Sequence, residues 1–258
     1  METISFHIDK LDSMKRYPQD LYYLGNVSLL QNKMVSIVGS RKPNNYARNL
    51  THQLASALSQ RGITIVSGGA LGIDTTAHKA AGMNNTIMIA GTGLDVRYPA
   101  INKTMIADIE NNGLMLSQFS PGTPSYPRNF AIRNELTVAL GDILVVAYSD
   151  LQSGTMRSVE YALKMGKSIY VFPHRIGESE GTNKLLQENK AQAIYDIDAF
   201  CDLLAPSKNI TPKNDDFLTY IKTNPFYDEA VLRYGEKIFE AELLGTIKIQ
   251  NGKIFPLT

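Results

Sequence analysis

Short apolar runs alternate along the chain with segments in which apolar residues recur every three or four positions. The runs are rich in β-branched residues and apolar nearly throughout, as strands buried on both faces are. They predict strands at Met34–Val38, Ile63–Val66, Thr86–Ala90, Leu114–Ser117, Ile143–Ala147 and Ser168–Phe172. The helical spacing, in most cases closed by a glycine, predicts helices at Ala47–Gln60, Ile73–Ala81, Ile101–Asn112, Phe130–Leu140 and Thr155–Met165.

This alternation of strands and helices predicts an α/β fold, with a doubly wound, mostly parallel sheet covered by helices on both faces. The sheet domain is expected at residues 34–205, after a lead-in segment at residues 1–33. Sheets of this kind bind their ligands in the loops at the carboxyl ends of the strands. Functional residues are therefore expected in the loops that follow the strands.

The C-terminal pattern predicts a second, smaller domain at residues 217–258, joined by a polar linker at residues 206–216. Three short helices are expected at Phe217–Thr223, Tyr227–Tyr234 and Glu236–Leu244, then strands at Thr246–Gln250 and Lys253–Pro256 around an Asn251-Gly252 turn. This order is that of a winged helix. From Asp215 to Thr258 there are seven acidic and five basic residues, which favours a protein-contact or capping role over duplex DNA binding.

The composition of the 258-residue chain is ordinary for a globular protein, with 43% hydrophobic and 20% charged residues. No apolar run approaches the ~18 residues of a membrane span, and the N-terminus has no basic stretch followed by an apolar core. One cysteine, Cys201, allows no internal disulfide. These features predict a cytoplasmic protein without a membrane partner.

The formal net charge is only +1, but the charges are unevenly distributed. Residues 21–73 contain five Lys or Arg and no acid, and residues 111–134 contain two Arg and no acid. Residues 178–205 instead contain six acids and two Lys. One interpretation is a positive face that attracts phosphate backbones, and the other is chance variation on a solvated surface.

A glycine turn follows the first strand and leads into the first helix, with Gly39, Ser40, Arg41 and Lys42 in it. Glycine lets a phosphate approach the partial positive charge of a helix N-terminus. Arg41 adds a planar cation suited to phosphate oxygens or to a base. The alternative is a tight turn whose arginine faces solvent.

A second turn of this kind follows the next strand and holds Ser67, Gly68, Gly69, Gly72 and Asp74. Successive loops at the carboxyl edge of a sheet face the same side, so the two turns predict adjacent backbone nests for neighbouring phosphates. Asp74 either caps its helix or positions Arg41, and capping is the commoner role.

Two further segments are expected to add donors at the same edge. The first is predicted to carry Arg128 and Asn129 in a loop, followed by Phe130, Arg133 and Asn134 in a helix. Aromatic rings interleaved with cations suit single-stranded nucleic acid, whose bases stack on rings, although core packing is the alternative for Phe130. The second segment opens a helix after the strand at 143–147, with Ser153, Gly154 and Thr155.

The sequence nominates no catalytic residue, metal site or cofactor. No G-x-G-x-x-G is present, and the MGKS at residues 165–168 precedes a strand, where a nucleotide-binding P-loop would precede a helix. The four histidines lack metal-ligand spacing.

Several motifs in register closely resemble the DNA-processing protein A family, also called Smf, over Tyr17 to Ala205. They are YPQDLYYLGN, SIVGSRKPNNYA, IVSGGALGIDTTAH, GTGLDVRYPAIN, the pair Arg133-Asn134, SGT at residues 153–155 and GTNKLL at residues 181–186. The resemblance implies a Rossmann-like domain that binds single-stranded DNA, forms a homodimer and helps to load the recombinase RecA during natural transformation. It also implies a C-terminal winged-helix module.

The family's motif residues map onto both turns. Gly39, Ser40 and Arg41 match its Gly-Ser/Thr-Arg, and Ser67, Gly68, Gly72 and Asp74 match its SGxAxGID pattern. Two positions depart from the family. Glu135 stands where the family often has Arg, and Gln152 stands where it often has Glu.

The sequence is compatible with two functions, one a DNA-binding role and the other an enzymatic one. The first is a single-stranded DNA-binding protein, not an enzyme, that protects incoming DNA and delivers it to RecA. The alternative is a nucleotide phosphoribohydrolase, whose proteins resemble lysine decarboxylases and carry Pro-Gly-Gly-x-Gly-Thr-x-x-Glu at the equivalent loop. Residues 150–158 have no acid at the position of that glutamate, and Glu160 lies two residues further on.

Overall fold

The computed structural model describes residues 1–206, 216–243 and 245–257. The chain divides into two units, Met1–Pro206 and Ser207–Thr258. Of the linker predicted at residues 206–216, residues 207–215 lie outside the described residues. No helix among the described residues combines the length and the apolar character needed to cross a bilayer.

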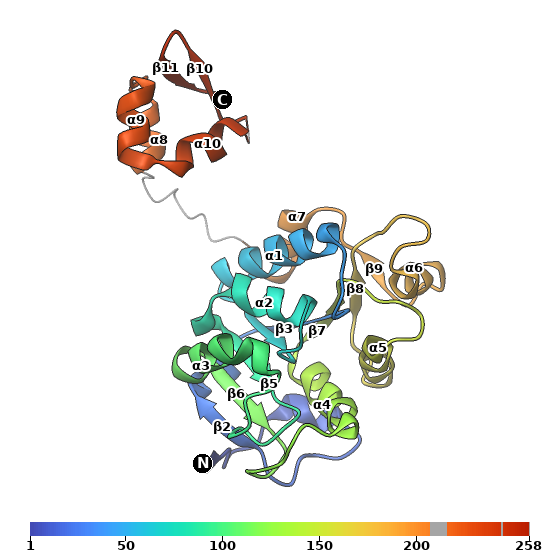
Figure 1. Cartoon of the computed structure of the whole chain (residues 1–258). Helices are drawn as coiled ribbons and strands as arrows, with labels where there is room; N and C mark the ends of the chain where they lie inside the picture. Colours follow the sequence, from blue (N-terminus) through green and yellow to red (C-terminus); the bar gives the residue numbers. More distant parts are fainter. Residues whose placement is uncertain (207–215, 244, 258) are drawn as a thin grey trace. The chain divides into compact units, whose positions relative to one another are not determined.

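Unit 1 is built on a nine-stranded sheet (Figure 1). In spatial order its strands are β1 (Glu2–Thr3), β2 (Tyr22–Gly25), β6 (Leu114–Ser117), β5 (Thr86–Ile89), β4 (Thr64–Ser67), β3 (Met34–Val38), β7 (Ile143–Val146), β8 (Ile169–Val171) and β9 (Gln192–Ala193). The strands from β6 to β9 in this order pair in parallel, whereas β2 pairs antiparallel with β6 and β1.

The strand order reverses direction between β3 and β7. From β3 the chain adds β4, β5 and β6 on one side, and it then returns to place β7, β8 and β9 on the other. Val35 of β3 accordingly pairs with Ile65 on one side and with Ile143 on the other. The loops that leave β3 and β7 diverge at this point, which opens a crevice at the carboxyl edge of the sheet.

Helices cover both faces of the sheet because its strands bury both sets of alternating side chains. One face packs against α1 (Asn45–Gln60), α2 (Ile73–Ala81), α3 (Lys103–Asn112) and α7 (Ile197–Leu204). The other packs against α4 (Pro127–Leu140), α5 (Gly154–Lys164), α6 (Glu180–Gln187) and the 3-10 segments η1 (Asp9–Ser13) and η2 (Val27–Gln31). The short 3-10 segments η3 (Met83–Asn85) and η4 (Ala100–Asn102) connect other elements.

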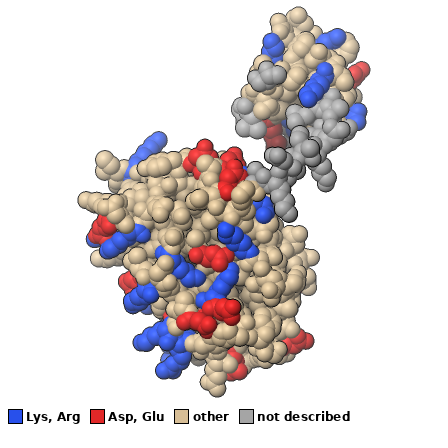
Figure 2. Space-filling model, turned by 180° about the vertical axis from the view of Figure 1, so that it is seen from behind, with Lys and Arg blue, Asp and Glu red and all other residues tan. Residues whose placement is uncertain are grey.

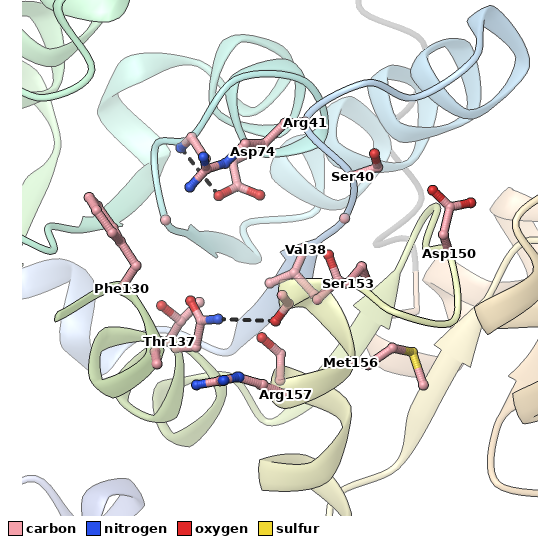
Figure 3. A pocket seen from close by; sticks show the side chains of 18 of the residues that line it. Val38, Ser40, Arg41, Asp74, Phe130, Thr137, Asp150, Ser153, Met156 and Arg157 are labelled. Atoms are coloured by element: carbon pink, nitrogen blue, oxygen red, sulfur yellow. Dashed lines mark hydrogen bonds between the residues drawn. The ribbon is translucent and has the colours of Figure 1, made fainter. Parts of the chain in front are cut away.

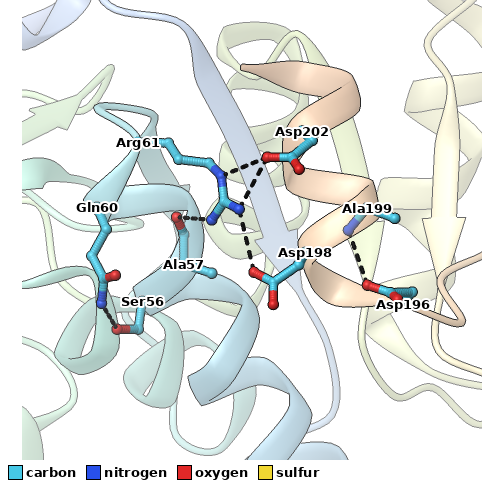
Figure 4. A network of polar contacts seen from close by, with 8 residues as sticks. All are labelled: Ser56, Ala57, Gln60, Arg61, Asp196, Asp198, Ala199 and Asp202. Atoms are coloured by element: carbon cyan, nitrogen blue, oxygen red, sulfur yellow. Dashed lines mark hydrogen bonds and ion pairs between the residues drawn. The ribbon is translucent and has the colours of Figure 1, made fainter. Parts of the chain in front are cut away.

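An arginine fastens α7 to the end of α1 (Figure 4). The Arg61 guanidinium donates to Asp198 at 3.3 Å and to Asp202 at 3.1 Å, and also to the Ala57 carbonyl of α1 at 3.2 Å. The arginine side chain is mostly buried while both carboxylates are more exposed. The network therefore helps to hold the last helix of unit 1 in place.

The six strands and five helices predicted for the sheet domain are confirmed, with small differences at their ends. The predicted helix at 130–140 begins three residues earlier, at Pro127, because proline is well suited to the first turn of a helix. Arg128 and Asn129, predicted in a loop, therefore lie in α4.

Several elements were not predicted. The segment at residues 1–33 is more than a lead-in, since it supplies β1 and β2 to the sheet. The side chains of β2 are half-buried or exposed, so the strand lacks the continuous apolar run from which the others were inferred. The helix α6 and the two-residue strand β9 were also missed.

Unit 2 contains α8 (Asp216–Ile221), α9 (Tyr227–Tyr234), α10 (Glu236–Leu243) and a hairpin of β10 (Ile247–Gln250) and β11 (Lys253–Pro256). Its core gathers one or two side chains from each element, including Ile221, Ala230, Ile238, Ile247 and Ile254. The three helices and the Asn251-Gly252 hairpin are confirmed, with α10 described as far as Leu243. The winged-helix assignment stays a prediction.

A neutral histidine is buried in unit 1. His78, in the last turn of α2, has Nδ1 2.7 Å from the Thr86 hydroxyl, which itself donates to the Ile65 carbonyl. Nδ1 must therefore carry the proton, and Nε2 has no partner among the described residues. Burial, followed by the charge of Arg133, lowers the pKa of His78 from 6.5 to about 3.

Acid should destabilise the fold through His78. Because its folded pKa is depressed, the unfolded chain binds the proton first, and stability falls as the pH drops from about 6.5 toward 3. Between pH 7 and pH 5 the wild type should lose about 2 kcal/mol more unfolding free energy than His78→Asn, which keeps a donor for Thr86 but does not titrate. Urea unfolding at both pH values measures this difference, and equal losses in the two proteins would contradict it.

Candidate nucleic-acid interface

A cavity of about 930 Å³ opens at the carboxyl edge of the sheet, where the loops after β3 and β7 diverge. Its walls come from the turn after β3, the turn after β4, the helix α4, and the loop and first turns of α5 after β7. Figure 3 shows Arg41 and Asp74 on one side of the cavity and Met156 and Arg157 across from them. The site thus lies where a doubly wound sheet is expected to bind a ligand.

The two glycine turns are packed directly against each other. Gly72 has a positive φ of 80°, and a Cβ at this position would lie 2.4 Å from the Ser40 carbonyl oxygen. That carbonyl accepts a hydrogen bond from the Ile73 N–H at 3.2 Å, while the Ser40 N–H donates to the Tyr148 carbonyl at 2.8 Å. The conformation of the first turn is therefore set by loops from β4 and β7.

The second turn differs from the free phosphate nest that was predicted, because one of its backbone donors binds a carboxylate of the chain itself. At the start of α2, the Thr75 N–H donates to the Ala70 carbonyl and the Thr76 N–H to the Gly72 carbonyl. The Asp74 carboxylate accepts from the Ala70 N–H at 3.3 Å and makes no N-cap bond, so it does not play the predicted capping role. A carboxylate of the protein itself thus occupies the anion position of this turn.

Arg133 and Asp74 are buried charges at the floor of the cavity. Arg133 is only 5% exposed and Asp74 only 7%. Burial raises the pKa of Asp74, and the positive charge of Arg133 partly opposes this rise. Burial lowers the pKa of Arg133; the Asp74 charge opposes this fall, and the nearby Arg41 charge adds to it. The positive charge that acts on Asp74 is therefore that of Arg133, whereas the sequence had suggested Arg41 as its partner.

Arg133 occupies space that only glycine leaves free. A Cβ at Gly68 would lie 1.5 Å from Nη1 and 2.3 Å from Cζ of Arg133. The guanidinium donates through Nη1 to the Ile89 carbonyl at 3.0 Å, but its Nε has no partner among the described residues. A buried cation with an unused donor beside an open cavity favours an anionic ligand.

Phe130 lies close to two guanidinium groups. The Cζ atoms of Arg41 and Arg133 lie 6.0 Å and 5.9 Å from the centre of its ring. The Tyr98 ring lies 5.4 Å away, in a small adjoining recess that shares Arg41, Arg133 and Phe130 with the main cavity. The half-buried Phe130 ring thus helps to orient both cations while still lining the cavity.

The positive charge is local to this cavity. Arg41, Lys42, Arg133 and Arg157 line it, with Asp74, Asp150 and Glu160 as its acids. On the face of unit 1 seen in Figure 2, Lys and Arg are interspersed with Asp and Glu and no broad basic area appears.

The N-terminus of α5 opens into the cavity, and α4 and α6 hold it there. Helix geometry leaves the N–H groups of Gly154 and Thr155 without intrahelical acceptors. Asn134 of α4 donates to the Gly154 carbonyl at 3.4 Å. From the start of α6, the Ser179 hydroxyl accepts from the Ser149 N–H at 2.9 Å, so the loop that precedes α5 is fixed on both sides.

Most of the predicted site residues meet in this cavity. It is lined by Gly39, Ser40, Arg41, Lys42, Gly68, Asp74, Phe130, Arg133, Asn134, Ser153, Gly154 and Thr155. Five others do not line it, namely Ser67, Gly69, Gly72, Arg128 and Asn129. Ser67 donates to the Ile37 carbonyl between β4 and β3, and Arg128 instead stacks on Tyr126.

Sequence reasoning missed Arg157, which lines the cavity from the first turn of α5. Its position three residues after Gly154 places it on the same helix face as the predicted donors, a signal available from helical spacing. Of the two departures from the family pattern, Gln152 lines the cavity, whereas Glu135 turns away and accepts from the Lys15 N–H at 2.8 Å.

The chain is similar to known proteins over its first unit. A family model described as DNA recombination-mediator protein A matches residues 6–205. The chain is 37% identical over 175 residues to DNA processing protein DprA of Streptococcus pneumoniae, covering 66% of this chain and 62% of that protein. It is 32% identical over 188 residues to Protein Smf of Escherichia coli, covering 71% of this chain and 50% of that protein. It thus spans roughly half to three-fifths of these relatives.

Two solved structures share the fold. DNA processing protein A from Helicobacter pylori, studied for its single-stranded DNA binding mode, has a TM-score of 0.77 at 38% identity and covers 79% of this chain and 94% of its own. The structure of DNA processing protein A from Streptococcus pneumoniae has a TM-score of 0.73 at 32% identity, and the match covers 79% of this chain and 73% of that one. With the family model matching residues 6–205, this chain belongs to the DNA recombination-mediator protein A family.

Proposed function

We propose that this chain binds single-stranded DNA in the cavity at the β3–β7 crevice. The observation that carries the proposal is the buried Arg133 cation, which lines an open cavity together with Arg41, Lys42 and Arg157. The Helicobacter pylori relative, studied for its single-stranded DNA binding, supports the choice of ligand.

The proposed mechanism is binding without a covalent step. Arg41, Lys42 and Arg157 supply charge to backbone phosphates, and the Gly154 and Thr155 N–H groups supply donors aligned with the dipole of α5. Phe130 offers an aromatic ring beside these cations, on which a base can stack. Whether Arg41 contacts a phosphate or a base depends on how the strand lies against that ring.

We further propose that the protein acts in the cytoplasm as a homodimer that protects incoming DNA and loads RecA onto it during natural transformation. Family membership supports this part of the proposal. RecA filament assembly on single strands, with and without this protein, measures the loading step, and sedimentation measures the dimer.

Replacing Arg41 by alanine should weaken binding to oligo-dT about tenfold, because a charge-assisted contact is lost. We expect sub-micromolar affinity for the wild type and weaker binding to duplex. The slope of log affinity against log salt should shrink by about 0.7 to 1, the share of one phosphate contact. Fluorescence anisotropy over a salt series measures both quantities.

The matched control is Lys79→Ala, which removes an exposed cation from the last turn of α2, at the opposite end of the helix from the cavity. It should leave affinity and slope close to wild type. An Arg41→Ala protein indistinguishable from Lys79→Ala would overturn the assignment of the cavity.

Replacing Gly68 by alanine should displace the Arg133 guanidinium without removing its charge. The new Cβ would overlap Nη1, so we expect affinity for oligo-dT to fall about ten- to a hundredfold while unit 1 stays folded. In a double-mutant cycle with Arg133→Gln, the Gly68→Ala effect should largely disappear. Additive losses in the double mutant would show that the two residues act independently.

The phosphoribohydrolase alternative draws support from one observation, that Asp150 and Glu160 line the same cavity. Its prediction is release of the base from nucleoside monophosphates, with loss of turnover in Glu160→Gln. We expect no release from either protein and unchanged oligo-dT binding in Glu160→Gln. Base release by the wild type that disappears in the variant would favour the enzyme instead.

A further inference from the structure

Three rings gather at the carboxyl edge of the sheet, beside the cavity and outside its lining. Tyr46 is in the first turn of α1, Tyr148 follows β7 and His174 follows β8. The His174 ring meets both tyrosines edge to face, at centroid distances of 5.5 Å to Tyr46 and 5.2 Å to Tyr148. These three residues are called the Tyr46 platform below.

The platform is held rigidly from behind. His174 Nε2 lies 2.9 Å from the Ala147 carbonyl oxygen, so it is the protonated nitrogen, and the buried Nδ1 has no partner among the described residues. Burial lowers the pKa of His174, which keeps the ring neutral at physiological pH. The backbone N–H of His174 also donates to the side-chain oxygen of Asn183 at 3.4 Å. The histidine is thus a fixed support for Tyr46.

The front of the platform is exposed, and exposed cations lie close to it in the sequence. Tyr46 is 49% exposed, Lys42 precedes α1 by three residues, and Arg175 follows His174 directly. The nearest acid on that loop, Glu178, accepts from the Asn44 amide at 3.1 Å, and the first turn of α1 contains no acid. A half-exposed ring on a rigid support among cations is the arrangement on which single-stranded bases stack.

The platform is continuous with the cavity. The Ser40 N–H of the cavity wall donates to the Tyr148 carbonyl at 2.8 Å. Lys42 lines the cavity and is four residues from Tyr46, which limits their Cα separation to at most about 15 Å. A strand that leaves the cavity over Lys42 can therefore reach the Tyr46 ring.

We infer that the Tyr46 platform is a second binding subsite, on which a base of the DNA strand stacks after the strand leaves the cavity. The inference rests on the proposed function, since it extends the same strand. It predicts a site longer than the cavity and tolerant of base identity, because every base offers a stacking face.

The test compares oligo-dT of 4 to 20 nucleotides. Tyr46→Ala should match the wild type on oligonucleotides short enough to lie within the cavity and bind the longest ones about 5- to 150-fold more weakly, the value of one stacked base. Tyr46→Phe should restore the affinity and Tyr46→Leu should not, because stacking needs the ring. Tyr195→Ala, at an 85% exposed tyrosine before α7, is the matched control and should bind every length normally.

A direct readout is photocrosslinking of a 5-iodouracil oligonucleotide, with the adduct expected on the peptide that contains Tyr46. Equal binding of wild type and Tyr46→Ala at every length would overturn the inference, as would full rescue by Tyr46→Leu. In that case, weaker oligo-dT binding by Arg41→Ala would still support the cavity as the site of DNA binding. A wild type that binds no oligonucleotide of any length would defeat the proposed function and, with it, the subsite.

Discussion

The burial of a positively charged guanidinium at the floor of the cavity is the constraint around which the site is arranged. Arg133 reaches this position because residue 68 has no side chain, and its charge is only partly balanced by the buried Asp74. A buried cation without a full set of partners costs stability, and Arg133 also lines the cavity. The proposed anionic ligand would offset part of that cost.

The two glycine turns look alike in sequence and have different roles. The turn after β4 donates from its Ala70 N–H to the Asp74 carboxylate and packs against the turn after β3, so it acts as a support. The turn after β3 rests on that support and presents Arg41 and Lys42 to the cavity. Supporting and presenting elements are also separate on the other side of the crevice, where α4 and α6 fix the loop that presents the N-terminus of α5.

Aromatic rings complete the arrangement at the carboxyl edge. Phe130 lies close to Arg41 and Arg133 inside the cavity, and the Tyr46 platform lies just outside it. In both places a ring is fixed by its neighbours and stays partly accessible. In the proposed function, charge provides affinity for a phosphate chain, and the rings provide stacking surfaces that do not depend on base identity.

The sequence alone determined the sheet domain and most of the site. Buried parallel strands read as continuous apolar runs, and glycine turns after strands mark the binding edge, so β3 to β8 and twelve of the cavity residues were predicted. It did not reveal β2, whose side chains are half-buried or exposed, or the position of Arg157 in the cavity.

Tertiary structure decided which of the candidate residues line the cavity. The sequence could not show that Arg133, in the middle of a helix, passes through the space beside Gly68, or that the second turn donates to the chain's own Asp74 carboxylate. Burial and hydrogen-bond pairing depend on residues distant in sequence that only the folded sheet brings together. Local pattern therefore determined the elements and their edge, and long-range packing determined which charges remain free to bind.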